Sequence, residues 1–270
     1  MTPIEFKDRV ILVTGGASGI GLAVCRAMAK IGAQVAMVDM DAHALALQEQ
    51  WFKDKGWKVF IHTCDVRDPL ACRGAVRETL DHFGRLDILF NNAGITQRGL
   101  FEKTRTSVFH RVMDTNFYGA LYMTKAAFPH LMASRGAIVV NESIAGVAPL
   151  LGRTGYAASK HALHGLFTSL RCELRSQGVH VMILCPGFIK TNLQTRALGA
   201  DGNLARHGQT RVGAQQSPES VARAFIHGLG KKKSMVVLTP MGKLGYWVAR
   251  LFPGLYESLM TWQFKRELSI

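Results

Sequence analysis

The chain has 270 residues, long enough to bury a large core, and 48% of them are hydrophobic with only 8 prolines, which excludes a disordered protein. Its formal net charge of +14 is spread along the chain without a nucleic-acid motif, so we expect no nucleic-acid partner. The excess of positive charge has three possible explanations. It could simply cover a solvated surface, steer anionic ligands or attract the protein to an anionic membrane surface. Five scattered cysteines without a C-x-x-C pair, and a start unlike a signal peptide, predict a cytoplasmic protein.

Seven short apolar runs alternate with helical patterns along the chain. We expect strands within 9–15, 33–39, 57–65, 86–94, 136–143, 179–187 and 234–240. We expect helices within 18–31, 69–83, 105–133, 156–177 and 217–229. The runs are nearly continuous in Val, Ile and Leu, as in parallel strands covered on both faces. The pattern predicts an α/β fold with a single Rossmann-type, doubly wound parallel sheet of about seven strands and helices on both faces.

The first strand ends in a glycine-rich turn, "TGGASGIG", at residues 14–21. Gly15 permits a tight turn, Gly19 lets the backbone approach a pyrophosphate at the start of the helix, and Gly21 allows close packing of helix on strand. A glycine trio alone is weak evidence, but here a strand precedes it and an amphipathic helix follows. The turn therefore predicts a dinucleotide-binding site.

Acidic residues end the second and third strands. Asp39 lies eighteen residues after Gly21, where a carboxylate accepts hydrogen bonds from an adenosine ribose diol and repels a 2′-phosphate. This predicts NAD in preference to NADP. Asp65 is placed to meet the adenine edge. Both residues have the alternative of a simple turn or cap role.

Further motifs follow in order: "CDV" (64–66), "NNAG" (91–94), "DTNFYGA" (114–120), "NESIAG" (141–146), "YAASK" (156–160) and "PGFIKT" (186–191). Together with the glycine spacing, they resemble the short-chain dehydrogenase/reductase family, in its classical branch, over about residues 8–240. One position departs from that pattern. The family commonly has a second serine before the catalytic one, where this chain has Glu142. This departure predicts a changed polarity of the pocket with the chemistry retained.

Tyr156 and Lys160 are four residues apart and share one face of a helix. An adjacent ammonium is expected to lower the pKa of the tyrosine, so that the phenol can take a proton from an alcohol or return it to a ketone. Ser143 would polarise the substrate oxygen. The resemblance implies that Asn116 completes a proton relay beside the lysine, and that Lys160 holds the nicotinamide ribose. The predicted catalytic set is thus Asn116, Ser143, Tyr156 and Lys160.

The resemblance also implies a cofactor site made of several segments. It comprises Gly15, Ser18, Gly19, Ile20, Gly21, Asp39, Asp65, Val66, Asn92, Ala93, Gly94, Tyr156, Lys160, Pro186, Gly187, Ile189 and Thr191. Asn91 is expected to stabilise the centre of the sheet. We expect no metal, because the histidines are not grouped with other ligands.

The expected substrate is a hydrophobic alcohol or ketone, such as a steroid, retinoid or lipid-like compound. Residues 144–152 are almost wholly apolar, as are Leu193, Ala197 and Leu198. Four arginines favour a different substrate, because any of them could bind a carboxylate or phosphate of an acidic substrate. They are Arg153, Arg196, Arg206 and Arg211. The long connection 192–216 is expected to form a mobile lid.

The last thirty residues are the most individual part of the chain. We divide the whole chain into a catalytic domain, residues 1–240, and an amphipathic C-terminal tail, residues 241–270. Aromatic and leucine residues recur there near helical spacing, interrupted by Pro253 and accompanied by basic residues. Such a segment packs on a partner subunit, closes the substrate cleft or lies peripherally on a membrane.

These features favour an NAD-dependent oxidoreductase, which we expect to be a homodimer or homotetramer. The alternative is a catalytically idle nucleotide-binding protein that acts through membrane or partner binding. All four catalytic positions are filled, which favours the enzyme. NADP use would favour a basic residue beside the acid of the second strand, where the chain has Met40.

Overall fold

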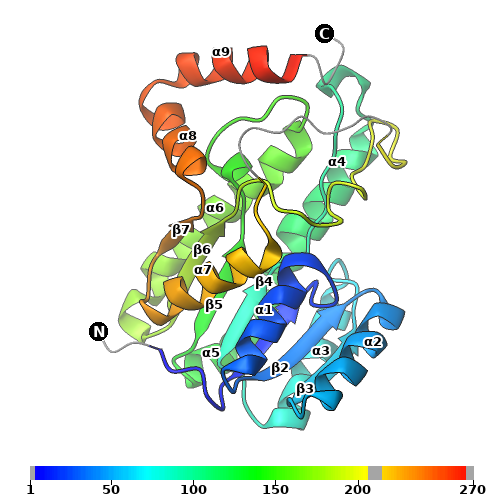
Figure 1. Cartoon of the computed structure of the whole chain (residues 1–270), viewed down its shortest axis with the longest axis vertical. Coiled ribbons are helices and arrows are strands. Elements are labelled where there is room, and N and C mark those ends of the chain that lie inside the picture. Colours follow the sequence, from blue (N-terminus) through cyan, green and yellow to red (C-terminus); the bar gives the residue numbers. More distant parts are fainter. Residues whose placement is uncertain (1–3, 206–214, 266–270) are drawn as a thin grey trace.

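The computed structural model describes residues 4–205 and 215–265, and is built on one parallel sheet (Figure 1). Its strand order is β3-β2-β1-β4-β5-β6-β7. The strands are β1 Val10–Thr14, β2 Gln34–Asp39, β3 Val59–Thr63, β4 Ile88–Asn91, β5 Ala137–Asn141, β6 His180–Cys185 and β7 Met235–Val237. All seven predicted strands are present, each shorter than its apolar run. The predicted fold class is confirmed.

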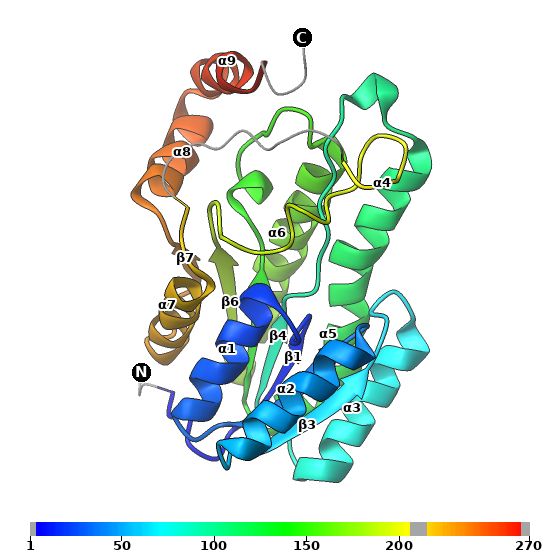
Figure 2. The same cartoon turned by 45° about the vertical axis from the view of Figure 1, so that its right-hand side comes forward.

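Helices cover both faces of this sheet, as Figure 2 shows after a turn about the vertical axis. One face carries α1 Gly19–Lys30, α2 Ala42–Asp54 and α7 Pro218–Gly230. The other carries α3 Pro69–Phe83, α5 Gly119–Ala133 and α6 Thr154–Leu174. Alternate residues of each strand enter the two cores, and the central strands are almost wholly buried. Burial at about 25 cal/mol per Å² of apolar surface is the main term that stabilises this arrangement.

The region predicted as one helix over 105–133 is divided in the structure. Helix α4, Thr106–Met113, passes into a π-helical turn, Asp114–Tyr118, before α5 begins. A π turn inserts one extra residue into the helix, and such turns are common at functional sites. Hydrophobic periodicity does not distinguish this local change, so the sequence predicted a continuous helix.

Two helices follow the last strand. Helix α8, Pro240–Leu251, and helix α9, Pro253–Phe264, lie at one end of the molecule in both views, with α9 outermost. Pro253 occupies the first turn of α9, where its missing N–H is tolerated. A Cβ added at Gly242 would lie 3.0 Å from Ile144 Cδ1, so α8 approaches the turn after β5 closely. Within the described residues, no helix combines the length and apolarity needed to cross a bilayer.

Candidate active site

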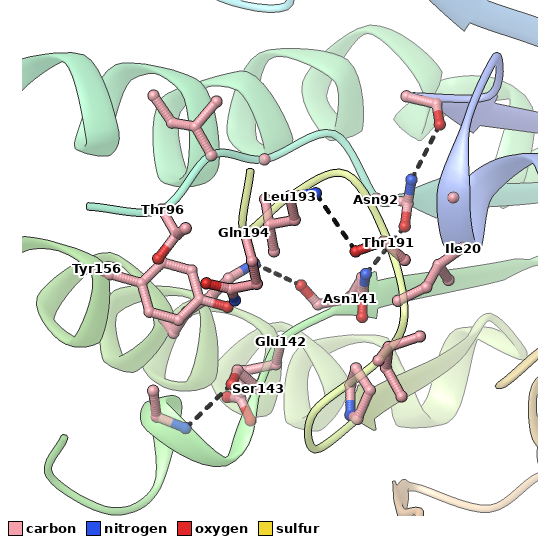
Figure 3. A pocket seen from close by; sticks show the side chains of 18 of the residues that line it. Ile20, Asn92, Thr96, Asn141, Glu142, Ser143, Tyr156, Thr191, Leu193 and Gln194 are labelled. Carbon is pink, nitrogen blue, oxygen red and sulfur yellow. Dashed lines mark hydrogen bonds between the residues drawn. The ribbon is translucent and has the colours of Figure 1, made fainter. Parts of the chain in front are cut away.

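A cavity of about 1310 Å³ opens where the carboxyl ends of the strands meet. Sixteen of the seventeen predicted cofactor residues line it, and so does Ser143 of the predicted catalytic set. The cofactor positions found there are Gly15, Ser18, Gly19, Ile20, Asp39, Asp65, Val66, Asn92, Ala93, Gly94, Tyr156, Lys160, Pro186, Gly187, Ile189 and Thr191. Figure 3 shows Ile20 and Asn92 toward one side of the cavity and Tyr156 toward the other. Of the predicted set, Gly21 and Asn116 do not line it.

The glycine turn forms one wall. Gly15 has a positive φ of 64° and Gly19 one of 54°, conformations that favour glycine. A Cβ at Gly21 would lie 2.1 Å from the carbonyl oxygen of Gly15, so this residue permits the close approach of α1 to the end of β1. Ser18, the residue before α1, makes no side-chain cap, and it lines the cavity together with Gly19 and Ile20 of the first helical turn. The turn thus has the form of an anion cradle.

The acidic residues after β2 and β3 also lie at this wall. Asp39 accepts hydrogen bonds from the backbone N–H of Ala17 at 3.1 Å and of Asp41 at 3.2 Å, which ties the glycine turn to β2. Asp65 accepts from Arg67 Nε at 2.9 Å. The Arg67 side chain holds the pKa of Asp65 below its ordinary value. Arg67 was not among the predicted residues, because an ion pair two residues apart at a strand end has no distinct pattern.

The "NNAG" segment joins neighbouring strands. Asn92 Nδ2 donates to the carbonyl oxygen of Thr14 at 2.9 Å, and its backbone N–H donates to the Thr14 hydroxyl at 3.0 Å. Asn91 is buried and donates to the Thr124 hydroxyl at 2.8 Å, which fixes β4 to α5. These contacts hold residues 92–94 against the glycine turn.

Tyr156 and Lys160 project from the first turns of α6, and both are buried. The Lys160 ammonium lies 5.7 Å from the centre of the Tyr156 ring. It donates to the carbonyl oxygen of Asn141, the last residue of β5, at 2.7 Å. Asn141 in turn donates from Nδ2 to Asn92 Oδ1 at 2.9 Å. Asn141 was not singled out by the sequence, although it begins the quoted "NESIAG" motif.

The pKa of Tyr156 is raised, not lowered as the sequence predicted. Burial of the phenol is the main cause, and a hydrogen bond with Ser143 opposes it. The prediction was wrong on this point because burial of the phenol outweighs the effects that favour the phenolate. The Lys160 ammonium faces the ring and the Asn141 carbonyl, and burial lowers the pKa of Lys160 to about 8.

Ser143 follows β5 and begins a short 3-10 turn, Ile144–Gly146. Its hydroxyl accepts the N–H of Ala145 at 3.2 Å and is within hydrogen-bonding reach of Tyr156. The two hydroxyls therefore face the same point of the cavity. A substrate oxygen placed there would meet a donor and a proton-transfer group together.

Asn116 lies in the π turn and is buried. Its Nδ2 donates to the carbonyl oxygen of Ile95 at 3.0 Å and to the Ser159 hydroxyl at 2.9 Å. Its Oδ1 accepts the N–H of Ile95 at 2.8 Å. Asn116 is thus fixed to α6 through Ser159, the residue before Lys160. Within the described residues, Asn116 makes no direct hydrogen bond to the Lys160 side chain.

The segment after β6 closes the cavity from the other side. Ile189 pairs with Gln216 as an isolated bridge. A Cβ at Gly19 would lie 3.3 Å from Thr191 Cγ2, so the "PGFIKT" segment approaches the glycine turn. The described parts of the predicted lid, 192–205 and 215–216, contain no helix.

The remaining lining is largely apolar. It includes Ile144, Ala148, Pro149, Leu150, Leu193, Leu198, Tyr256, Met260 and Phe264. The last three belong to α9, so the tail forms part of the cavity wall. Arg153 is buried with its guanidinium 6.0 Å from the centre of the Phe264 ring, and Arg196 also lines the cavity. Ala197 is buried outside it, and Arg206 and Arg211 lie outside the described residues.

No metal site is present among residues 4–205 and 215–265, because no group of three His, Cys, Asp or Glu side chains there is placed to hold an ion. Glu142, by contrast, lines the cavity and is buried beside Ser143. The sequence predicted only a change of polarity at this position. Its partners come from α6 and β6, which sequence spacing does not reveal.

Comparison with known proteins agrees with this geometry. Dehydrogenase/reductase SDR family member 7B from Bos taurus is 37% identical over 269 residues, covering 97% of this chain and 83% of the relative. 11-beta-hydroxysteroid dehydrogenase-like 2 from Arabidopsis thaliana is 34% identical, covering 95% of this chain and 82% of the relative.

Solved structures share the fold at lower identity. A short chain dehydrogenase/reductase from Burkholderia phymatum in complex with NAD superposes with a TM-score of 0.84 at 23% identity, over 93% of this chain and 96% of the other. An alcohol dehydrogenase from Thermococcus sibiricus complexed with 5-hydroxy-NADP gives 0.74 at 23% identity, over 86% and 96%. A family model described as short chain dehydrogenase matches residues 9–200. The chain therefore belongs to the short chain dehydrogenase family of oxidoreductases.

Proposed function

We propose that this protein interconverts a hydrophobic secondary alcohol and its ketone, with NAD(H) as the preferred cofactor. The observation that carries the proposal is the convergence of Ser143, Tyr156 and Lys160 on one cavity, between the glycine turn and an apolar wall. The names of the relatives, dehydrogenase/reductase and hydroxysteroid dehydrogenase-like, support this class of reaction.

In this proposal Tyr156 is the group that moves the proton. Its hydroxyl would take the proton of an alcohol, or donate one to a ketone oxygen, while Ser143 donates a hydrogen bond to the same oxygen. Lys160 supplies a buried positive charge four residues along the helix, fixed by the Asn141 carbonyl. When bound, the nicotinamide would supply or accept the hydride.

The cavity fits a dinucleotide through its backbone cradle. Gly15 and Gly19 have positive φ, and the start of α1 faces the cavity, so N–H groups are available to a pyrophosphate. Asp39, which lines the cavity, would accept hydrogen bonds from the adenosine ribose. A carboxylate close to a 2′-phosphate is a like-charge contact that costs on the order of a few kcal/mol when partly buried, which favours NAD(H) over NADP(H).

The substrate would occupy the side of the cavity lined by the turn after Ser143 and by α9. Leu150, Met260 and Phe264 provide an apolar surface there. Such a lining favours extended hydrophobic compounds over small polar ones. A panel of steroid, retinoid and fatty alcohols and ketones, followed by absorbance of the reduced cofactor, tests this. Turnover confined to small hydrophilic alcohols would contradict the proposed substrate class.

The cofactor preference has a direct test in Asp39→Asn. The amide keeps an oxygen for the N–H of Ala17 and removes the charge, so NADP(H) should gain in kcat/KM relative to NAD(H) by at least about tenfold, which corresponds to about 1.4 kcal/mol. Asp54→Asn, at the far end of α2 where Asp54 accepts from Gln50, is the matched control. A wild-type enzyme that prefers NADP(H) would contradict the proposal.

The outward face of the tail is proposed to rest on an anionic lipid surface. On α8, Leu244, Trp247 and Leu251 form an exposed stripe, with Lys243 and Arg250 exposed beside it. Apolar side chains flanked by basic ones are typical of helices that lie in a membrane interface. A hydrophobic substrate dissolved in such a membrane would then be close to the cavity.

Helix α9 continues this surface and is apolar on two sides. Tyr256 and Phe264 point inward and are buried, whereas Leu255, Leu259 and Trp262 are exposed on the opposite side. Trp262 is 76% exposed. The inner side is explained by the cavity wall, and the outer side has no contact within the described residues that accounts for its composition.

A further inference from the structure

Glu142 is a buried carboxylate directly before the catalytic Ser143. Its side chain is 0% exposed, although it borders the cavity. Figure 3 shows the two side chains next to each other at the end of β5. Burying an isolated carboxylate is costly, so one that remains must be held by partners.

Two side chains hold Glu142. The Cys185 thiol at the end of β6 donates to Oε2 at 2.8 Å, and His164 Nδ1 on α6 lies 2.8 Å from Oε1. When Glu142 is ionised its oxygens only accept, so the His164 tautomer that fits this contact is the one with its proton on Nδ1. His164 is 30% exposed, so it connects the buried carboxylate with the protein surface.

The turn that follows Ser143 packs on the same carboxylate. A Cβ added at Gly146 would lie 2.7 Å from both Cγ and Cδ of Glu142, and 2.9 Å from the carbonyl oxygen of Lys160. The Ile144–Gly146 turn is therefore packed closely between the Glu142 side chain and α6. Since Ser143 begins this turn, the position of its hydroxyl depends on the Glu142 side chain.

Glu142 faces ionisable groups on two of the elements that pack against it. They are Tyr156, Lys160 and His164 on α6, and Cys185 on β6; the Ile144–Gly146 turn carries none. In a water-excluded site, a negative charge stabilises a neighbouring ammonium and opposes formation of a neighbouring phenolate.

We propose that Glu142 is a positioning residue, which acts through its charge on Lys160 and Tyr156 and through its packing on the turn that presents Ser143. The inference rests on the proposed function, because it assigns Glu142 to that same site. Burial lowers the pKa of Lys160 to about 8, and the Glu142 charge acts against this effect. The Glu142 charge also contributes to the raised pKa of Tyr156, after burial.

The charge effect can be measured without turnover. In protein labelled at lysine side chains, the NMR signal of Lys160, identified by its loss in Lys160→Arg, is followed against pH. Glu142→Gln should move the titration midpoint of Lys160 to lower pH, because the ammonium loses an attractive partner. Glu142→Ser, which places there the residue common in the family, should move it in the same direction and serves if the glutamine variant does not fold.

Glu78→Gln is the matched control. Glu78 pairs with His62 Nδ1 at 2.9 Å, the same chemistry on β3 and α3 away from the cavity, so its loss should leave the Lys160 midpoint unchanged. A Lys160 midpoint that is equal in wild type and in folded Glu142 variants would overturn the inference, whether or not the enzyme is active.

Turnover gives an independent readout once a substrate is found. In alcohol oxidation, Glu142→Gln should move the pH profile of kcat to lower pH, because Tyr156 and Lys160 both lose a negative neighbour. A lowered kcat with an unshifted profile would overturn the action through charge. Failure to find any alcohol substrate would count against the proposed function and leave the NMR result standing.

Discussion

Tyr156 works from a buried position, and this sets the direction of its pH dependence. Burial raises its pKa, so the phenol is protonated at neutral pH in the free protein. Ketone reduction needs this protonated form, and alcohol oxidation needs the deprotonated one. We therefore expect oxidation to accelerate as the pH rises toward the raised pKa, while reduction is sustained at lower pH.

Tyr156→Phe isolates the hydroxyl from the ring. The ring packing is retained, so the protein should fold and bind cofactor, whereas turnover should fall by about 10²–10⁴-fold, the usual range for general acid–base catalysis. Steady-state kinetics and cofactor fluorescence titration measure the two properties separately. Retention of more than about a tenth of the activity would place the proton donor elsewhere.

Single residues differ in how well the sequence predicted them. The placements of Ser143, Tyr156 and Lys160 followed from motifs whose spacing is fixed by one strand end and one helix. The direction of the pKa shift of Tyr156 did not follow from these motifs, because it depends on burial and on where the Lys160 ammonium points. Glu142 and His164 are 22 residues apart, and only the folded chain brings them together.

At the scale of elements, β1 and α1 approach each other closely at the glycine turn. Gly21 allows it, because any side chain there would overlap the Gly15 carbonyl. Helix propensity alone would favour alanine at this position. Tertiary packing therefore decides the residue, against local preference.

Gly21→Ala should destabilise the protein by roughly 1–3 kcal/mol, since the backbone of the turn has to move. Gly74→Ala is the control: Gly74 lies within α3 with no atom within 4 Å of an added Cβ, so alanine should stabilise by about 0.5–1 kcal/mol. Denaturant unfolding compares the two. Equal effects of the two substitutions would contradict the packing argument.

The seven strands were predictable because buried parallel strands are continuously apolar, and the start of α7 because Ser217 caps it before a proline. Its hydroxyl accepts the N–H of Ser220 at 3.3 Å. The π turn at Asp114–Tyr118 was not predictable, since the side-chain pattern of the helix continues through it. Which faces of the C-terminal helices are covered also required the three-dimensional arrangement.

On the scale of the whole molecule, the sheet and the tail enclose the cavity from opposite sides. The predicted cofactor residues come from the carboxyl ends of the strands, the segments after them and α6, whereas Tyr256, Met260 and Phe264 reach the cavity from α9. The inner side of α9 thus closes the apolar side of the cavity, and its outer side continues the exposed stripe of α8. One helix therefore links the apolar interior of the cavity with an apolar exterior.

Binding to vesicles tests the outer surface. The wild-type protein should co-sediment with vesicles that contain phosphatidylserine, less at high salt, and Trp247→Gln/Trp262→Gln should reduce this binding, because both indoles are exposed. Leu47→Gln/Leu70→Gln removes two side chains of similar exposure on α2 and α3, and should bind as wild type. Cofactor binding should be unchanged in both variants, since none of the four residues lines the cavity. A different result would assign this surface to a second copy of the chain. In that case the wild-type protein would not bind vesicles, and it would form a dimer that dissociates in the tryptophan variant.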